Sequence, residues 1–254
     1  ICNTKSANNS IDISGTTLIA DCLITNNTAT MSDNYDYLGH GGIYSKGSLT
    51  MERCKLIGNY SSRIGAIGNT DGTVVIKDCL IVGNYTTRSY LTGGIYATAD
   101  ATTTIRNCTI VSNRTLAAST AGGVYAASAK CKITDCLIWD NVHQGTDAET
   151  GATVLTRKDV GGTPQVRYSC YSEADPANVD GNIGFGEGFD PKIRYRGRNM
   201  YHVRIGSPCI DAGDRATDRN ESDKDLAGNP RVRCGRIDMG CYEEPSGGFK
   251  VIVR

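Results

Sequence analysis

The sequence is poor in several residue types, and each deficit argues against a class of protein. Its 254 residues include three Phe, one Trp, six Pro and three His. No apolar run approaches the ~20 residues that a membrane-spanning helix requires. The 27 basic and 27 acidic residues cancel, so no net field attracts nucleic acid or an anionic membrane. We therefore expect no transmembrane segment and no nucleic-acid partner; the sequence gives no indication of an oligomeric state.

A leader is not evident either. The chain opens with Ile1 instead of Met and shows no basic-then-apolar segment, so we expect a processed or excised piece. In contrast, 30 Gly and 13 Tyr are present. This composition indicates many turns and strands, not a helical bundle.

A repeating unit organises the first part of the chain. Each copy has a cysteine, an Ile or Leu two positions later and an Asn five positions later; the cysteines are Cys22, Cys54, Cys79, Cys108 and Cys136. A glycine pair followed by an aliphatic residue precedes most copies, as in Gly41-Gly42-Ile43-Tyr44, with a degraded version in Gly65-Ala66-Ile67-Gly68. A repeat of this length predicts a solenoid.

The pattern within each unit selects the kind of solenoid. Helical repeats need long segments with a period of 3.6 residues, and none fits between the glycines. Instead, three short stretches alternate with a period of two, such as Gly41/Ile43, Leu49/Met51 and Cys54/Leu56. We therefore predict a parallel β-helix with three strands per coil, in which like residues stack about 4.8 Å apart.

Stacking assigns roles to the repeated residues. We expect the Cys, Ile and Leu positions to form inward ladders, with free, structural cysteines. Each Asn should bond the Asn of the next coil at a corner, where its tolerance of left-handed geometry is useful. No Cys-x-x-Cys pair is present and the histidines lack ligand spacing, so redox or metal roles for these cysteines are not expected.

With these residues in view, the coils resemble the pectin-lyase-like right-handed parallel β-helix proteins of bacterial surfaces. The C-terminal part resembles the closing module of the "choice-of-anchor Q" β-helix family. The matching segments, in order, are Val166-Arg167-Tyr168-Ser169-Cys170, Gly206-Ser207-Pro208-Cys209-Ile210-Asp211-Ala212-Gly213-Asp214, Asp225-Leu226-Ala227-Gly228-Asn229-Pro230-Arg231 and Ile237-Asp238-Met239-Gly240-Cys241-Tyr242-Glu243.

The resemblance implies an all-β chain in three parts. These are right-handed β-helix coils over residues 1–141, a strand-rich closing module over 142–244 packed on the end of the coils, and a tail over 245–254. It also implies an exported protein, extracellular or on the bacterial cell surface and associated with the outer membrane, although no anchoring device is visible.

One departure from the family pattern concerns cysteines. Cys209 and Cys241 stand where the family often has small residues such as Ala. They are either small buried side chains or part of a bridge among Cys209, Cys234 and Cys241, which an exported protein would permit.

Enzymatic motifs of this fold are incomplete. Gly39-His40-Gly41 and Asn69-Thr70-Asp71-Gly72 resemble polygalacturonase signatures, but the Asp-Asp pair is missing and the order is reversed. A lyase would need stacked acids that hold Ca²⁺, whereas the column of Asp21, Asp78 and Asp135 is interrupted by Arg53 and Asn107. We therefore assign no catalytic residue and do not favour an enzyme.

The closing module is richer in acids. Asp211, Asp214, Asp223 and Asp225 are weak candidates for a structural Ca²⁺ site. Asp and Gly at such spacing also build turns, and both readings stay open. No other cofactor is expected.

A duplicated turn is the main candidate for function. Tyr60 and Arg63 recur as Tyr85 and Arg88 in the next coil, and an insertion one coil earlier contains Tyr35, Tyr37 and His40. Aromatic faces stack on sugars and Arg binds carboxylates, so this edge could bind an acidic glycan. Alternatively, these side chains simply cover the corner. A second column of Tyr44, Tyr96 and Tyr125, broken at Gly68, is interpreted as a β-surface preference.

These observations order three functions. The first is an exported, surface-associated protein that is glycan-binding or adhesin-like and not catalytic, with a polysaccharide or a host or cell-surface glycan as partner. The second is a polysaccharide lyase or glycoside hydrolase acting on an acidic polysaccharide. The third is a structural stalk.

Overall fold

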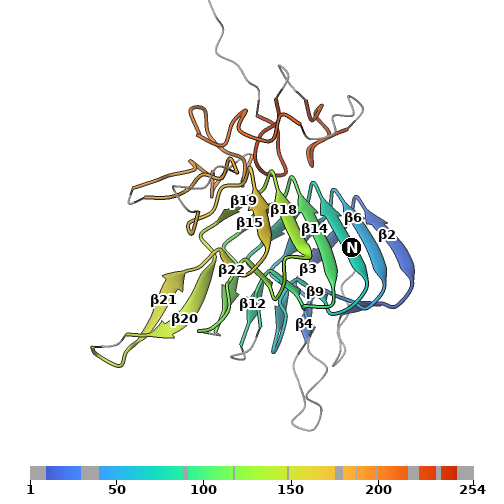
Figure 1. Cartoon of the computed structure of the whole chain (residues 1–254), viewed down its shortest axis with the longest axis vertical. Helices are drawn as coiled ribbons and strands as arrows, with labels where there is room; N and C mark the ends of the chain where they lie inside the picture. The colour runs from blue at the N-terminus through green and yellow to red at the C-terminus, as the bar shows by residue number, and fades with distance from the viewer. Residues whose placement is uncertain are drawn as a thin grey trace, which may run out of the picture.

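The chain winds into a stack of β-strand coils with a second, irregular layer against one side (Figure 1). The computed structural model describes residues 10–29, 40–87, 91–116, 118–147, 149–174, 180–186, 188–197, 199–216, 223–232 and 236–244. The predicted fold class is confirmed, because strands of successive coils pair in parallel and no helix is found among these residues. The described part accordingly holds no helix that is long and apolar enough to span a membrane.

The strands fall into four sheets, which we name A to D. Sheet B consists of β1 (Ile11–Ile13), β5 (Ile43–Ser45), β9 (Ile67–Asn69), β13 (Ile95–Ala97), β17 (Val124–Ala126) and β22 (Val160–Gly162). Sheet C consists of β2 (Thr16–Ala20), β6 (Ser48–Glu52), β10 (Thr73–Lys77), β14 (Thr102–Arg106), β18 (Cys131–Thr134) and β23 (Gln165–Arg167).

Sheets A and D complete each coil. Sheet A consists of β3 (Leu23–Thr25), β7 (Lys55–Ile57), β11 (Leu80–Val82), β15 (Thr109–Val111) and β19 (Leu137–Trp139). Sheet D consists of β4 (Thr28–Ala29), β8 (Tyr60–Ser61), β12 (Tyr85–Thr86), β16 (Arg114–Thr115), β20 (Val142–Thr146) and β21 (Thr153–Arg157). The chain therefore runs B, C, A, D within a coil, and sheet D adds a two-residue strand to the three that the alternation predicted.

The end of the stack lies beyond residue 141, where we placed the boundary. β22 and β23 continue sheets B and C after that residue, and β20 and β21 form an antiparallel hairpin that projects from sheet D (Figure 1). From residue 168 on, the described chain forms isolated bridges and turns instead of strands. The strand-rich character expected of 142–244 is thus confined to its first part, because the Asp, Gly and Pro of the later motifs favour turns.

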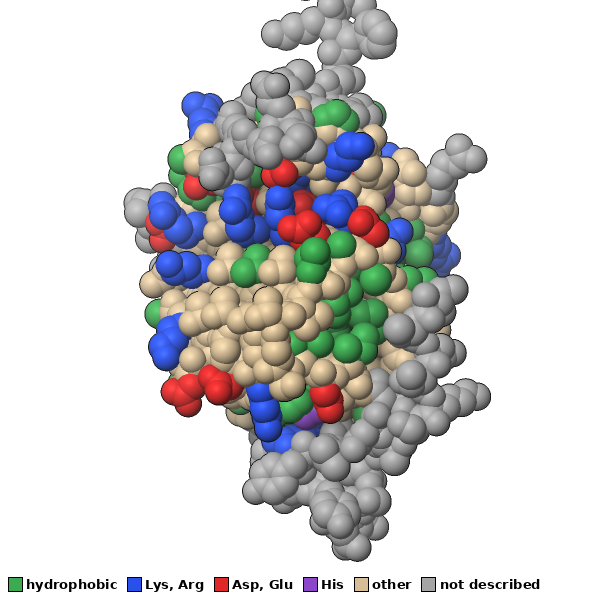
Figure 2. Space-filling model, turned by 90° about the vertical axis from the view of Figure 1, so that its right-hand side faces the viewer, with side chains coloured by type: hydrophobic (Ala, Val, Ile, Leu, Met, Phe, Trp, Pro, Cys, Tyr) green, Lys and Arg blue, Asp and Glu red, His purple; other side chains and the backbone are tan. Residues whose placement is uncertain are grey.

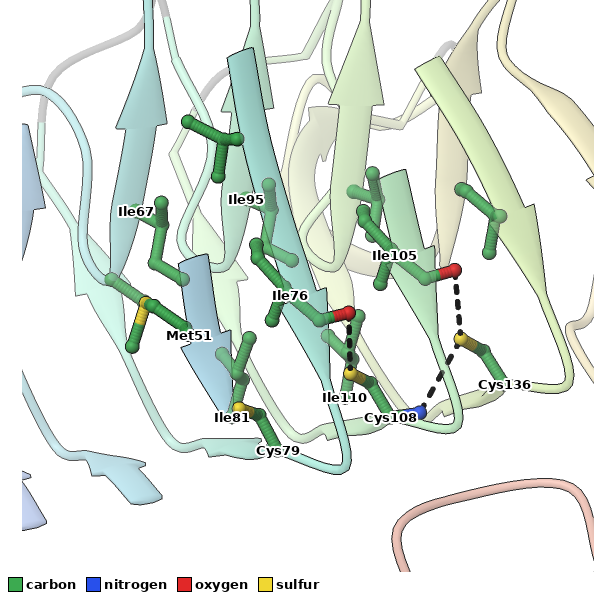
Figure 3. Packing of buried hydrophobic residues seen from close by; sticks show 14 of the residues in the cluster. Met51, Ile67, Ile76, Cys79, Ile81, Ile95, Ile105, Cys108, Ile110 and Cys136 are labelled. Carbon is green, nitrogen blue, oxygen red and sulfur yellow. Dashed lines mark hydrogen bonds between the residues drawn. The ribbon is translucent and has the colours of Figure 1, made fainter. Parts of the chain in front are cut away.

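Inward ladders of apolar side chains fill the coils, as predicted. Ile67 and Ile95, Ile76 and Ile105, and Ile81 and Ile110 are fully buried and lie in register on neighbouring strands (Figure 3). The cysteines extend this packing at the corner between sheets C and A. The Cys108 thiol lies 3.6 Å from the Ile76 carbonyl oxygen, and the Cys108 N–H donates to the Cys136 sulfur at 3.4 Å (Figure 3).

All nine described cysteines are free, and eight of them are buried. The expectation of free ladder cysteines is therefore confirmed. Cys209 and Cys241 are both fully buried and are not bonded to each other. Cys234, the third cysteine of the suggested bridge, lies outside the described residues.

The asparagines form a continuous hydrogen-bonded ladder. Each Asn donates from its backbone N–H and its side-chain amide to the Oδ1 of the Asn one coil on; from Asn84 to Asn113 both distances are 2.9 Å. The Asn84 amide also donates to the Leu56 carbonyl at 3.0 Å. Our expectation that these asparagines adopt left-handed geometry is wrong. The positive φ falls one residue earlier, at Asn26, Gly58, Gly83, Ser112 and Asp140.

The closing module packs mainly against the side of the stack, a position that the sequence did not indicate. Side chains on the outer face of sheet A, including Val111, Leu137 and Trp139, share a buried cluster with Met239 and Tyr242. Figure 1 shows these later segments lying along the coils. The end of the stack is covered by an earlier segment, whose Tyr171 and Ala174 pack against the interior of the coils.

Charged side chains gather where the two layers meet. Figure 2, which views the molecule from the side of β2, shows a band of basic and acidic side chains in the upper half of the view and hydrophobic side chains below it. Two ion pairs join the layers directly: Lys77 Nζ lies 2.8 Å from an Asp223 carboxylate oxygen, and Arg231 Nε lies 3.3 Å from an Asp78 oxygen. Others, such as Arg53 with Asp21 at 2.8 Å, link neighbouring coils.

Candidate functional site

The outer face of sheet B presents a column of aromatic side chains with one missing member. Tyr44, Gly68 and Tyr96 are paired in register on β5, β9 and β13, and Tyr125 follows on β17. Tyr96 and Tyr125 stack with ring centroids 5.8 Å apart and planes 7° apart. Gly68 interrupts this stacking because it occupies the tyrosine position without a side chain.

A hollow of about 340 Å³ lies at this interruption. Its lining combines two aromatic rings, two cations, hydroxyl groups and aliphatic side chains. The lining residues are His40, Tyr44, Lys46, Arg63, Ile64, Thr70, Leu91, Tyr96 and Thr98. Apolar ring faces together with a few fixed polar groups are the usual composition of a small-ligand site.

The glycine is required by the local packing. A Cβ built on Gly68 would lie 2.5 Å from Ile64 Cδ1 and 3.6 Å from both the His40 and Tyr44 rings. Ile64 is buried, and its side chain therefore covers the position that a larger residue at 68 would occupy. The backbone of this strand thus lies close to the floor of the hollow.

His40 forms part of the wall and is held uncharged. Its ring stacks on Tyr44 with centroids 4.0 Å apart, and its backbone bridges Ile64 of the next coil. Burial and the nearby Arg63 and Lys46 cations lower the pKa of His40 to about 4, although Asp12 opposes the shift. The imidazole is therefore neutral at physiological pH, and it does not add a third positive charge to the hollow.

Two cations and a hydroxyl pair give the hollow its polarity. Lys46 Nζ lies 5.3 Å from the centroid of the Tyr44 ring, within the range of a cation–π contact. Arg63 is close enough to Tyr96 to lower the pKa of its phenol, but burial outweighs this effect and raises that pKa. The Thr70 hydroxyl donates to the Tyr44 hydroxyl at 3.1 Å, which fixes the orientation of that ring.

The predicted tyrosine pair lies on a different face. Tyr60 and Tyr85 are in register on sheet D, as expected, with ring centroids 5.5 Å apart. Arg114 follows in the next coil, with its guanidinium carbon 5.2 Å from the Tyr85 ring centroid. Arg63, predicted to act with these tyrosines, instead lines the hollow.

The structure thus divides the predicted residues between two places. His40 and Arg63 lie at the hollow, while Tyr60 and Tyr85 lie on sheet D. The remaining three predicted residues, Tyr35, Tyr37 and Arg88, lie outside the described residues.

Sequence reasoning missed the side chains that complete the hollow. Tyr44 and Tyr96 were interpreted as a β-surface preference, and Lys46 was not considered. The usable signal was the degraded repeat ending in Gly68, since a glycine at a tyrosine position in stacked coils interrupts the column of rings.

The acids proposed for Ca²⁺ are engaged in turns and ion pairs. Asp225 Oδ1 accepts the Ala227 and Asn229 N–H groups at 2.9 and 2.7 Å, and its Oδ2 accepts the Glu243 N–H at 2.8 Å. Asp223 pairs with Lys77. Within the described ranges, no three His, Cys, Asp or Glu side chains form a group that could hold a metal ion, so Asp211 and Asp214 do not join these two in one site.

The residues of the enzyme-like motifs are buried or make hydrogen bonds within the coils. Asp78 and Asp135 are buried, so they are not part of an exposed acidic column with Asp21. Asn69 points inward and donates to the Thr103 hydroxyl at 2.9 Å, while Asp71 accepts the Gly72 N–H in a turn. These residues stabilise the coil and do not form a carboxylate pair.

Comparison with known proteins supports the fold assignment. A family model described as the right-handed β-helix region matches residues 2–164. No curated protein matches the chain, and no solved structure matches it. Since the matched segment covers most of the chain and coincides with the stacked parallel sheets, the protein belongs to the right-handed β-helix family.

Proposed function

We propose that this protein is a non-catalytic glycan-binding protein and that its binding site is the hollow between Tyr44 and Tyr96. The observation that supports the proposal is the aromatic column interrupted at Gly68 and flanked by Lys46 and Arg63. Tyrosine faces bury the apolar C–H surfaces of sugars, and fixed hydroxyl and cationic groups bind their polar substituents.

The sheet D face is a weaker site for the same ligands. Tyr60 and Tyr85 stack next to Arg114, so this face also combines aromatic rings with a cation. The hollow at Gly68 adds a second cation and hydroxyl groups to its aromatic rings, which is closer to the usual composition of a small-ligand site.

Glycan-array binding followed by titration tests the proposal. We expect the wild-type chain to bind at least one polysaccharide or cell-surface glycan. Tyr96→Ala should weaken that binding about tenfold or more, since it removes an aromatic side chain that lines the hollow. The matched variant Tyr85→Ala should bind as the wild type does. The proposal fails if the wild-type chain binds no glycan, or if Tyr85→Ala and not Tyr96→Ala abolishes binding.

We also propose that the protein is exported, acts at a bacterial surface in an adhesin-like role, and belongs to the choice-of-anchor Q family. Support comes from the residues of the C-terminal motifs. Arg231 lies 3.3 Å from Asp78 and 3.1 Å from Glu243, and the Asp238 N–H donates to Glu243. Arg231 and Glu243, which come from two of the C-terminal motifs, thus help to hold the closing module on the coils. This shared contact is a physical reason for the motifs to be found in the same chain. Detection of the native protein on intact cells by antibody labelling tests this location.

One observation favours a polysaccharide lyase as a second candidate. A neutral imidazole at His40 stacks on the Tyr44 phenol, with Arg63 at the same hollow. Such groups could remove the proton next to the carboxylate of a uronate while the glycosidic oxygen leaves, with formation of a carbon–carbon double bond. Ultraviolet absorbance of the unsaturated product during incubation with uronic-acid polysaccharides would support this function over binding alone.

A further inference from the structure

We infer that the β20–β21 hairpin joins two copies of this chain, through antiparallel pairing of β21 with the β21 of a second copy about a two-fold axis at Leu155. The inference concerns assembly and does not depend on the proposed function. It follows from the outer edge of β21, the apolar side chain at the centre of that edge, and the charges at the two ends of the hairpin.

β21 is the terminal strand of sheet D. Its inner edge pairs with β20 over all five of its residues, and its outer edge has no strand partner in the part of the chain that the structure describes. β16 pairs with just the first two residues of β20, Val142 and His143. The rest of the hairpin therefore projects from the stack as a two-stranded ribbon, with the outer edge of β21 facing away from β20 (Figure 1).

The hydrogen bonds at the two ends of the hairpin show which backbone groups of β21 point outward. The Asp147 N–H donates to the Ala152 carbonyl at 2.8 Å, and the Lys158 N–H donates to the Asn141 carbonyl at 2.8 Å. Hydrogen-bonded and non-hydrogen-bonded positions alternate along an antiparallel pair. Even-numbered residues of β21 therefore bond within the hairpin, and odd-numbered residues direct their N–H and C=O groups to the outer edge. These outward residues are Thr153, Leu155 and Arg157.

This edge lacks the usual protection of an exposed strand. Natural proteins place Pro or charged side chains on such edges, or cover them, because an unpaired strand edge pairs with other chains. β21 contains no Pro, and Leu155 at its centre is 51% exposed. Its one charged residue, Arg157, is engaged within the chain, since it lies 2.6 Å from Asp140 and 4.7 Å from the Trp139 ring centroid. The edge is therefore suited to the addition of another strand.

A second β21 fits this edge with Leu155 on the two-fold axis. Each Leu155 then lies opposite its own copy, and Thr153 of one chain lies opposite Arg157 of the other. All three pairs are hydrogen-bonded pairs, because the same residues direct their backbone groups outward in both copies. The Cβ atoms of opposed residues lie about 4.5–5.5 Å apart, so the two leucine side chains shield each other from water. No two like charges face each other in this register.

The charges at the ends of the hairpin favour a second copy as the partner. The turn at the tip carries Asp147 and Glu149, and Asp147 Oδ1 accepts the Glu149 N–H at 3.1 Å. The base carries Lys158, directly after β21. An antiparallel pair places the acidic tip of each hairpin beside the basic base of the other, so unlike charges attract at both ends of the contact. A parallel pair would instead bring the two acidic tips together.

Sedimentation equilibrium of the whole chain tests the association. One strand pair is smaller than a standard interface of about 1,600 Å², so we expect a dimer with a Kd on the order of 100 μM. The average mass should therefore rise toward twice the monomer mass between about 10 μM and about 1 mM. A wild-type chain that stays monomeric at about 1 mM would overturn the inference.

A substitution on the two-fold axis tests the interface. Leu155→Lys places like charges opposite each other and should raise the Kd at least about tenfold. The control Leu18→Lys changes a leucine that is 66% exposed in the first coil, and it should associate as the wild type does. If Leu155→Lys does not fold, Leu155→Thr keeps a residue suited to a strand and removes most of the apolar contact. Unchanged association of a folded variant at position 155 would overturn the inference.

Amide hydrogen exchange locates the contact on β21. With a Kd on the order of 100 μM, the Leu155 N–H should exchange about fourfold more slowly at about 1 mM than at about 10 μM. The Val154 N–H already bonds within the hairpin and should change less. Dimerisation with new protection elsewhere and none at Leu155 would contradict this interface. Protection of Leu155 in a chain that stays monomeric would show that another segment of the same chain covers the edge, and it would also overturn the inference.

Discussion

Asn141 donates two hydrogen bonds to a single oxygen of Asp159, from its backbone N–H at 2.9 Å and from its side-chain amide at 2.8 Å. This pair terminates the asparagine ladder, because Asp159 occupies the acceptor position that the next Asn would fill. The second Asp159 oxygen accepts the Ser172 N–H at 3.1 Å. The ladder therefore ends on a carboxyl group whose two oxygens accept from Asn141 and Ser172.

Removing one ladder member should destabilise the coils. Asn84→Ala deletes the acceptor for two Asn59 donors and the donor to Leu56 and Asn113, all of them buried. Buried polar groups left without partners cost about 1–3 kcal/mol each. We expect the free energy of unfolding, measured in urea, to fall by about 3 kcal/mol or more. Thr73→Ala, at an exposed strand position, serves as the control and should change it by less than about 0.5 kcal/mol. A similar small change for Asn84→Ala would contradict a stabilising ladder.

Asp159 should make stability depend on pH. Burial and the neighbouring Glu173 raise the pKa of Asp159 from 3.8 in the unfolded chain to about 7. The folded chain therefore holds this proton more tightly, so the contribution is fully present below about pH 4 and is lost as pH rises through 7. A shift of this size corresponds to about 4 kcal/mol.

Asp159→Asn isolates that contribution. Between pH 5 and pH 8 the wild-type chain should lose more of its free energy of unfolding than the variant does. Asp78 and Glu243 also have a raised pKa, to about 7 and about 9, and both remain in the variant. The difference between the two proteins therefore reports Asp159 alone. Parallel pH profiles would show that Asp159 is not protonated in the folded chain.

Arg231 should hold the closing module on the coils. Its guanidinium contacts Asp78 and Glu243 and donates to the Gly240 carbonyl, and the side chain is almost fully buried. Arg231→Met leaves these groups without a buried cation, at a cost of about 3–5 kcal/mol. We expect early proteolytic cleavage within the module and a lower unfolding temperature. The control Arg157→Met removes an exposed pair with Asp140 and should cost about 1 kcal/mol or less. Equal effects of the two variants would contradict the account.

Thiol labelling should separate buried from accessible cysteines. Of the eleven cysteines, eight are buried in the described structure and Cys22 is exposed. A thiol-specific reagent should therefore modify at most three sites in the folded chain, as counted by intact mass. After unfolding without reductant, all eleven should react if no disulfide is present. Nine reactive thiols would reveal one bridge, and peptide mapping would show whether it includes Cys234.

The architecture could be predicted from the sequence because the same residue pattern recurs in every coil. Cys, Ile and Asn recur at fixed spacing, and stacking converts that spacing into ladders. The short strands of sheet D were not predicted, because a two-residue strand such as Tyr60–Ser61 is too short to show an alternating pattern. The left-handed corner was assigned to the wrong residue, since Asn tolerates that geometry but here serves as donor and acceptor.

The hollow was harder to predict. It depends on the absence of a side chain at Gly68 and on the register of three strands, and neither is visible until the coils are aligned. The position of the closing module against sheet A was also hidden. The available signal was that strands such as Leu80–Val82 carry apolar residues on both faces, and both faces are buried in the structure.

A crystal structure of the chain bound to its tightest glycan tests the central claim most directly. The account predicts electron density for a sugar ring in the hollow lined by Tyr44, Tyr96 and Arg63. Density on the Tyr60–Tyr85 face, or at any site away from the hollow, would contradict it.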